Sequence, residues 1–427
     1  MNKRVADFEG ASKRQRLGAV TFRSVVLAVV FVLRLQTAVF LKQFEAAMIE
    51  PLNKTKRDDY PKFPNTDNNW PCKGCGTYKP AASFGPNPKH LNGLKHQCLE
   101  CCRSNSKTYD RTLRGHVKYL MRHARSAAKD RGQAFTLTFA EAMEILNSQR
   151  GRCCYSGHRL IFRPLTSWSA SLERLNDKVG YTKDNVVFVA QRFNTCGLEN
   201  RGKYDIVGSA KWSKEKFQQV YVKVYETTTP EMLDAIAAGR TRPHGQYHGR
   251  ANRKPDSRGR WPCTNCTQYK ERTQFDTQNK KLGTPKSRCK KCINDTSRER
   301  KRTNPRRFIG SMLNDARKNN KDRSKKDRPL QFSITINYLM SILYEQKGLC
   351  AISHIPMNLR PCSDWKCSIE RIDNRIGYVP GNVTLVCNEF NTADGSLNKG
   401  VDQDAVEGTA QWTRQLFLDA WFPGQTT

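Results

Sequence analysis

The sequence predicts an α+β protein in which one unit occurs twice in tandem, with basic helices connecting its parts. The first observation is an internal repeat, because seven Trp, Cys, Tyr and Phe residues between Trp70 and Cys101 recur at an offset of 191. The second is a pair of CxxC motifs in each copy. The third is the formal net charge of +35, which 74 Lys and Arg residues give against 39 Asp and Glu.

The repeat runs through most of the chain. The offset between the copies grows to 197 from Phe135 and Phe332 onward and to 200 at Trp212 and Trp412. Solenoid repeats are about 20 to 50 residues long, and this period is far longer. We therefore expect each copy to fold as an independent pair of domains, a small module followed by a larger domain.

These patterns divide the chain into six segments. The first is expected to be a poorly structured leader, and the fourth a flexible basic linker rich in Gly, Pro, Arg and His. The segments are 1–69 (leader), 70–110 (zinc module 1), 111–225 (larger domain 1), 226–260 (linker), 261–300 (zinc module 2) and 301–422 (larger domain 2).

The leader contains the nine-residue apolar run Val25–Leu33, flanked by Arg23 and Arg34. Such a run has two interpretations, the apolar part of a signal peptide or a poor membrane anchor. Met48 is an alternative first residue of the protein. An arginine in the middle of a spanning helix costs about 2.5 to 3.5 kcal/mol. We therefore expect no stable membrane insertion.

The charge and the cysteines restrict the partner and the compartment. Solubility needs a net charge of only about 2 to 8 for a small domain, so +35 points to a polyanion such as DNA. Half of the 16 cysteines lie in CxxC pairs, a spacing that suits metal ligation better than disulfides. We expect an intracellular protein, in the nucleus or at a site of viral replication. No small-molecule cofactor is expected, and the duplication permits a monomer.

Each copy also predicts the same order of elements. Apolar spacing predicts a helix around Val117 and Met121, and a second one with Phe139, Met143 and Leu146 at i, i+4 and i+7. Short β-branched runs predict strands at 171–175 and 368–372. A Gly-Tyr turn follows, and an Asn is then expected to open a last helix with valines and a Phe on its buried face.

The CxxC pairs predict two structural zinc ions. In both copies 22 residues separate the two pairs, and two such knuckles give Zn²⁺ a tetrahedral set of thiolates. Four unpaired thiols or two disulfides are the alternatives. All four positions are filled by cysteine, so a catalytic zinc is not expected. The predicted ligands are Cys72, Cys75, Cys98, Cys101, Cys263, Cys266, Cys289 and Cys292.

The larger domains carry the patterns SLERLN and SIERIDN, a Gly-Tyr loop, and NVVFVAQRFN and NVTLVCNEFN. These motifs resemble HNH endonucleases of the ββα-metal fold, in particular the phage and large-virus type with a preceding Cys-rich zinc module. The resemblance covers about residues 70–220 and 261–420. It implies a metal-dependent DNA endonuclease of homing or mobile-element type that uses Mg²⁺ or Mn²⁺.

Site residues follow from the same resemblance. The implied ligands of the divalent ion are Glu173 and Asn194 in copy 1, and Glu370 and Asn391 in copy 2. Asn185 and Asn382 are expected to hold the loop. A hard divalent ion prefers such oxygen ligands, and it stabilises the charge that develops on the phosphate.

Two departures from the family pattern concern the chemistry itself. Arg174 and Arg371 stand where HNH enzymes place a general-base histidine, although the viral type carries Arg there. Arginine is able to clamp a phosphate but not to accept a proton at neutral pH. Both copies also carry Glu where Asp is usual. The alternative function is therefore that of a non-catalytic, zinc-containing DNA-binding protein derived from such a nuclease. For the Glu-Arg motif itself, the alternative is an exposed charge pair on a strand.

Overall fold

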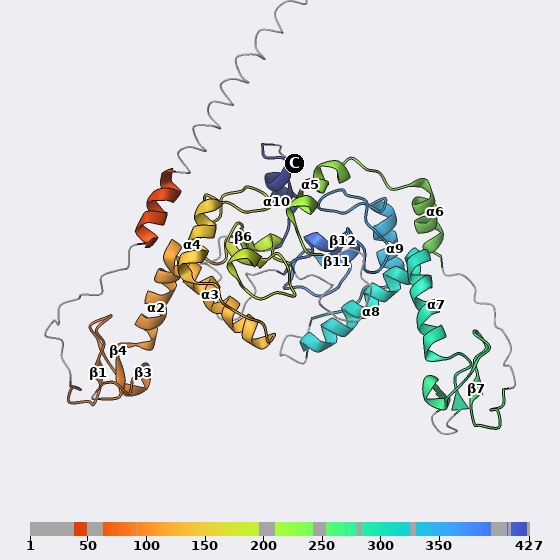
Figure 1. Ribbon diagram of the computed structural model, residues 1–427, viewed down its shortest axis with the longest axis horizontal. Helices are drawn as coiled ribbons and strands as arrows, with labels where there is room; N and C mark the ends of the chain where they lie inside the picture. Colours follow the sequence, from red (N-terminus) through yellow and green to blue (C-terminus); the bar gives the residue numbers. More distant parts are fainter. Residues whose placement is uncertain are drawn as a thin grey trace, which may run out of the picture. The chain divides into compact units, whose positions relative to one another are not determined.

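The computed structural model describes residues 38–48, 63–90, 92–195, 210–241, 253–279, 284–324, 330–393, 408 and 411–424. It consists of two compact units (Figure 1). Unit 1 comprises Met1–Pro164 and Trp168–Gln191, and unit 2 comprises Leu165–Ser167 and Arg192–Thr427. The apolar run at 25–33 lies outside the described residues.

Unit 1 begins, in its described part, with a helix over residues 38–48, followed by the zinc module and the larger domain. Each of its sheets has two antiparallel strands, paired β1–β2, β3–β4 and β5–β6. The strands are β1 (Trp70–Pro71), β2 (Tyr78–Lys79), β3 (Phe84–Pro86), β4 (Leu94–Cys98), β5 (Ala170–Arg174) and β6 (Val186–Ala190). The helices are α2 (Leu99–Asp110), α3 (Leu113–Asp130) and α4 (Phe139–Ser148), with 3₁₀ turns η1 (Ala81–Ser83) and η2 (Lys183–Asn185).

Unit 2 repeats this order and adds elements from the end of copy 1. Its strands pair in the same way as β7–β8, β9–β10 and β11–β12. The strands are β7 (Trp261–Pro262), β8 (Tyr269–Lys270), β9 (Thr277–Asn279), β10 (Thr284–Pro285), β11 (Cys367–Arg371) and β12 (Val383–Cys387). The helices are α5 (Lys214–Lys223), α6 (Pro230–Gly239), α7 (Lys290–Thr303), α8 (Pro305–Ser324), α9 (Ile336–Glu345) and α10 (Arg414–Trp421), with 3₁₀ turns η5 (Arg272–Gln274) and η6 (Asn388–Phe390).

The predicted α+β class is confirmed, and the apolar stripes lie where the sequence places helices. Thr138 caps α4 through a capping box with Glu141, and Met143 and Leu146 on that helix are fully buried. The equivalent helix α9 buries Met340 and Leu343. Amphipathic spacing and a start signal thus agree on the same helix in both copies.

The last helix expected after Asn185 and Asn382 is wrong. Residues Val186–Ala190 form strand β6, which pairs with β5 in the register Arg174↔Val186, and β12 pairs with β11 in the same way. The apolar spacing fits either element over so short a run, and the β-branched valines favour a strand. Among the residues described directly after each strand, a single 3₁₀ turn follows, η6 in copy 2 and η3 (Gln191–Phe193) in copy 1.

The leader and the linker contain equivalent helices, contrary to expectation. Phe40 of the 38–48 helix packs close to Gly151, and Ile236 of α6 packs close to Gly348. The guanidinium of Arg114 donates to the Ala47 carbonyl oxygen at 2.6 Å, and Arg306 donates to the Gly239 carbonyl at 3.0 Å. Each copy therefore begins with a short docked helix ahead of its zinc module. Within the described ranges, no helix is both long and apolar enough to cross a membrane.

The core of unit 2 combines aromatic side chains from both copies. Trp212 of copy 1 is fully buried, its indole N–H donates to the Glu389 carbonyl oxygen at 3.2 Å, and its ring lies 5.5 Å from that of Phe390. Trp421 donates to the Phe217 carbonyl oxygen at 2.9 Å. The end of copy 1 is thus part of the fold of copy 2, which corrects the expectation that each copy folds independently.

Candidate functional site: two cysteine clusters and a repeated hairpin

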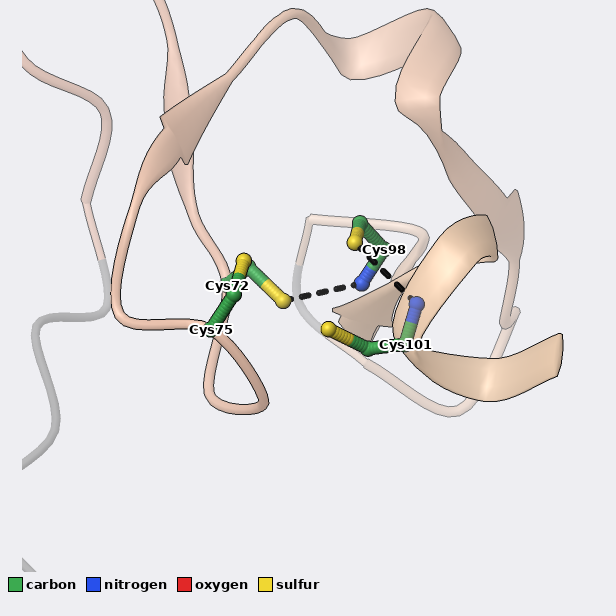
Figure 2. Close-up of side chains that lie close together, drawn as sticks. All are labelled: Cys72, Cys75, Cys98 and Cys101. Carbon is green, nitrogen blue, oxygen red and sulfur yellow. Dashed lines mark hydrogen bonds between the residues drawn. The ribbon is translucent and has the colours of Figure 1, made fainter. Parts of the chain in front are cut away.

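The first cysteine cluster lies where two hairpins meet the start of α2. Figure 2 shows the side chains of Cys72, Cys75, Cys98 and Cys101 gathered around one point. Their sulfur atoms all lie within 4.8 Å of one another. Cys98 caps α2, which places Cys101 one turn further along the helix. This arrangement matches the tetrahedral thiolate set that structural zinc requires.

The second cluster has the same construction. Cys263, Cys266, Cys289 and Cys292 also lie within 4.8 Å of one another, and Cys289 caps α7. All eight cysteines are free thiols in the structure, so neither cluster is a pair of disulfides. Phe275 packs against the second cluster, and Phe84 packs against the first.

Backbone N–H groups stabilise the thiolate form of one cysteine in each cluster, Cys72 and Cys263. Burial raises the pKa of Cys72, but backbone N–H groups led by that of Cys98 outweigh burial and lower the pKa to about 6. In the second cluster, burial is likewise outweighed by N–H groups led by that of Cys266, which lower the pKa of Cys263 to about 6. The thiolate is the form that binds metal. Both clusters are therefore able to hold a zinc ion.

A repeated hairpin with an anchored loop is the second feature. The side-chain amide of Asn382 donates to the carbonyl oxygens of Asp373 and Gly377, while its oxygen accepts from the Asp373 N–H. Asn185 holds the loop of copy 1 in the same way, with donated bonds to Asn176 and Gly180. Both asparagines thus hold the loop between the two strands, the role expected from sequence, although they precede a strand and not a helix.

The glycine of each Gly-Tyr turn allows the loop to touch the backbone of an earlier segment. A Cβ atom on Gly377 would lie 1.9 Å from the Gln331 carbonyl oxygen, and one on Gly180 would lie 2.0 Å from that of Ala134. No larger residue fits such a close approach. The loop is therefore fixed at both of its ends.

Arg371 and Arg174 point into this loop. Arg371 is buried, and its guanidinium donates to the carbonyl oxygens of Asn374 at 2.9 Å and Ile376 at 3.1 Å. It also lies over the Tyr378 ring, 5.2 Å from the centroid. Arg174 makes the equivalent bonds to Asp177 and Val179. In each arginine the Nη1 atom donates to the loop carbonyls, and the phosphate clamp expected of these arginines stays a prediction.

Glu370 lies near the end of strand β11, and Asn391 contacts the first half of the same strand. Glu370 is 6% exposed, and its carboxylate accepts a hydrogen bond from Gln411 Nε2 at 2.9 Å. The side-chain amide of Asn391 donates to Ser368 Oγ at 2.8 Å and to the carbonyl oxygen of Ile369 at 2.9 Å. Because Nδ2 is used in these bonds, Oδ1 of Asn391 is the atom that remains to bind a cation.

In copy 1 the corresponding residues belong to different units. Glu173, which is 3% exposed, lies in unit 1, whereas Asn194 lies in unit 2. Copy 2 is therefore the copy in which one compact unit contains both residues. The sequence reasoning missed Gln411, which binds Glu370. Its place directly before the repeated Trp412 is the signal that would have found it, and Lys211 stands at that position in copy 1.

Comparisons with known proteins add a limited finding. No family model matches the chain, and no solved structure matches it. A segment of 69 residues is 42% identical to the uncharacterized 29.0 kDa protein in the dda-modA intergenic region of Enterobacteria phage T4. This segment is 16% of the present chain, and the match covers 27% of the length of the phage protein.

Proposed function

We propose that this protein is a metal-dependent DNA endonuclease of the HNH type, with copy 2 as the hydrolytic copy. The observation that carries the proposal is the buried Glu370, which follows Ile369, the residue whose carbonyl oxygen accepts from Asn391, in a hairpin whose loop is anchored by Asn382 and Arg371. The net charge of +35 supplies the attraction to a polyanion, and the likeness to a phage protein is in keeping with a site of viral replication.

The residues of copy 2 fit a hard divalent cation such as Mg²⁺ or Mn²⁺. Glu370 would offer a carboxylate oxygen and Asn391 its amide oxygen, the ligand types that such ions prefer. Two protein ligands leave other coordination positions for a phosphate oxygen and water. The ion would supply stabilisation of the charge that develops when the phosphodiester bond breaks.

The other residues prepare this site. Gln411 donates from one Nε2 atom to Glu370 and to the carbonyl oxygen of Arg371, both at 2.9 Å, so it orients the carboxylate without neutralising its charge. Arg371 and Asn382 hold the loop that follows the carboxylate. Arg371 stands directly after Glu370, where the family places a general-base histidine. Arginine does not accept a proton at neutral pH, so Arg371 is not the residue that activates water.

A second candidate is a non-catalytic DNA-binding protein with the same zinc modules and basic helices. This second candidate is favoured by the residue at the position of the usual general base. That residue is Arg371, which does not accept a proton and whose Nη1 atom donates to two loop carbonyl oxygens. Binding to DNA is common to both candidates, whereas strand cleavage separates them.

Nicking of supercoiled plasmid tests the proposal. We expect the wild-type chain to convert supercoiled to open-circular DNA with Mg²⁺ or Mn²⁺ but not with EDTA, and we expect Glu370→Ala to abolish nicking while DNA affinity is retained. Binding without any metal-dependent nicking would establish the second candidate.

A further inference from the structure

The two zinc modules differ at one pair of equivalent positions. In module 1, Lys79 on β2 forms an ion pair with Glu100 in the first turn of α2, with Nζ and Oε2 2.9 Å apart. The offset of 191 places Lys270 and Lys291 at these positions in module 2. A cation and an anion in one module thus correspond to two cations in the other.

The backbone around these positions is the same in both modules. Lys79 pairs with Trp70 across the β1–β2 hairpin, and Lys270 pairs with Trp261 across β7–β8. Glu100 and Lys291 each lie in the first turn of a helix that begins after a capping cysteine. The two lysines therefore occupy the places of the module 1 ion pair. In the part of the chain that the structure describes, no acidic side chain forms an ion pair with either of them.

The whole of helix α7 carries the same change of charge. It contains six basic and two acidic residues, whereas α2 contains two of each. Cys292 is the buried residue of α7, and Lys291 is exposed to solvent. Two ammonium groups at the places of the module 1 ion pair would repel each other, and an anion between them would remove that repulsion. A phosphate group has the charge and the acceptor oxygens to bind both.

We propose that Lys270 and Lys291 form a binding site for a backbone phosphate of DNA, and that module 2 contacts DNA where module 1 does not. The proposal rests on the DNA-binding part of the proposed function. Module 1 serves as the internal comparison, since Glu100 already fills the equivalent place there with a carboxylate.

The substitution Lys291→Glu tests the site, because it rebuilds in module 2 the ion pair that module 1 contains. The measurement is the affinity for a short duplex DNA over a range of salt concentrations, with zinc content checked for each variant. Loss of this one phosphate contact should reduce the slope of log K against log salt by about 0.9. The reciprocal variant Glu100→Lys should make the slope steeper.

Lys89→Glu is the matched control, since Lys89 is an exposed lysine of module 1 and the change in charge is identical. A clearly larger loss of slope and affinity in Lys291→Glu than in Lys89→Glu supports the site. Equal effects of the two variants overturn it, while salt-dependent binding by the wild type would leave the proposed function standing. A wild-type chain that does not bind DNA would overturn the proposed function and this site together.

Discussion

At the scale of single residues, the guanidinium of Arg371 determines the conformation of the loop next to Glu370. Its Nη1 atom donates to the carbonyl oxygens of both Asn374 and Ile376 and so joins two points of the loop. A histidine is too short to reach both carbonyls. A histidine placed here to restore the usual base would therefore release the loop.

Arg371→His should destabilise unit 2 and lower any nicking rate. Loss of hydrogen bonds from a buried charged group costs about 2 to 3 kcal/mol, which chemical unfolding of the purified variant would measure. The control is Arg375→His on the same loop, because the Arg375 side chain is 75% exposed and its surface ion pair with Asp373 contributes at most about 1 kcal/mol. A faster and equally stable Arg371→His variant would contradict this account of Arg371.

His116 gives unit 1 a dependence on pH. It is fully buried, its Nε2 lies 3.4 Å from the Ala170 carbonyl oxygen, and burial lowers its pKa below the usual 6.5. The unfolded chain therefore takes up a proton more readily as the pH falls below about 6.5, which lowers the stability of unit 1. Above that pH the histidine is neutral in both states.

His116→Phe should reduce this loss of stability, because phenylalanine cannot be protonated. Copy 2 already has the buried Phe308 at the equivalent position, so the larger ring is compatible with the fold. Thermal unfolding at pH 7.5 and pH 5 should show a smaller drop for the variant than for the wild type. An equal drop in both proteins would assign the acid sensitivity to other groups.

At the scale of elements, each four-cysteine cluster should bind one zinc ion. Cys263→Ser removes a ligand from module 2, so native mass spectrometry should find about two zinc ions in the wild type and about one in the variant. Cys102→Ser is the control, because Cys102 adjoins a ligand but lies outside the cluster. A stoichiometry of two in Cys263→Ser, or of none in the wild type, would contradict the zinc assignment.

The elements also show what the sequence was able to predict. The four-cysteine clusters and the helices with Met143 or Met340 follow from spacing that is local and repeated. Strand β6 was mistaken for a helix, because Val186 and Val189 fit both periods in so short a run. Gln411 was missed because its contact with Glu370 joins positions 41 residues apart, and no local pattern encodes such a contact.

At the scale of the whole molecule, the end of copy 1 and copy 2 share one hydrophobic core. Phe193 and Trp212 of copy 1 pack with Trp412 and Trp421 of copy 2 inside unit 2. Buried aromatic rings of this size contribute strongly to stability through their apolar area. Copy 2 therefore depends on residues that the repeat assigns to copy 1.

Trp212→Ala should destabilise unit 2 by about 3 to 5 kcal/mol, the usual cost of truncating a buried tryptophan. Phe188→Ala is the matched variant, because Phe188 is fully buried within unit 1. Hydrogen exchange read separately for the two units should show Trp212→Ala affecting unit 2 and Phe188→Ala affecting unit 1. A Trp212→Ala effect confined to unit 1 would contradict the assignment of Trp212 to the core of unit 2.

The central claim is that one of the two copies cleaves DNA through Glu370. Its most direct measurement compares metal-dependent plasmid nicking by Glu370→Ala and Glu173→Ala with that by the wild type, at equal DNA affinity. The account predicts a loss of at least about 100-fold for Glu370→Ala, from removal of a metal ligand, and a smaller loss for Glu173→Ala. Equal losses would contradict the assignment to copy 2, and unchanged nicking in both variants would contradict the nuclease proposal itself.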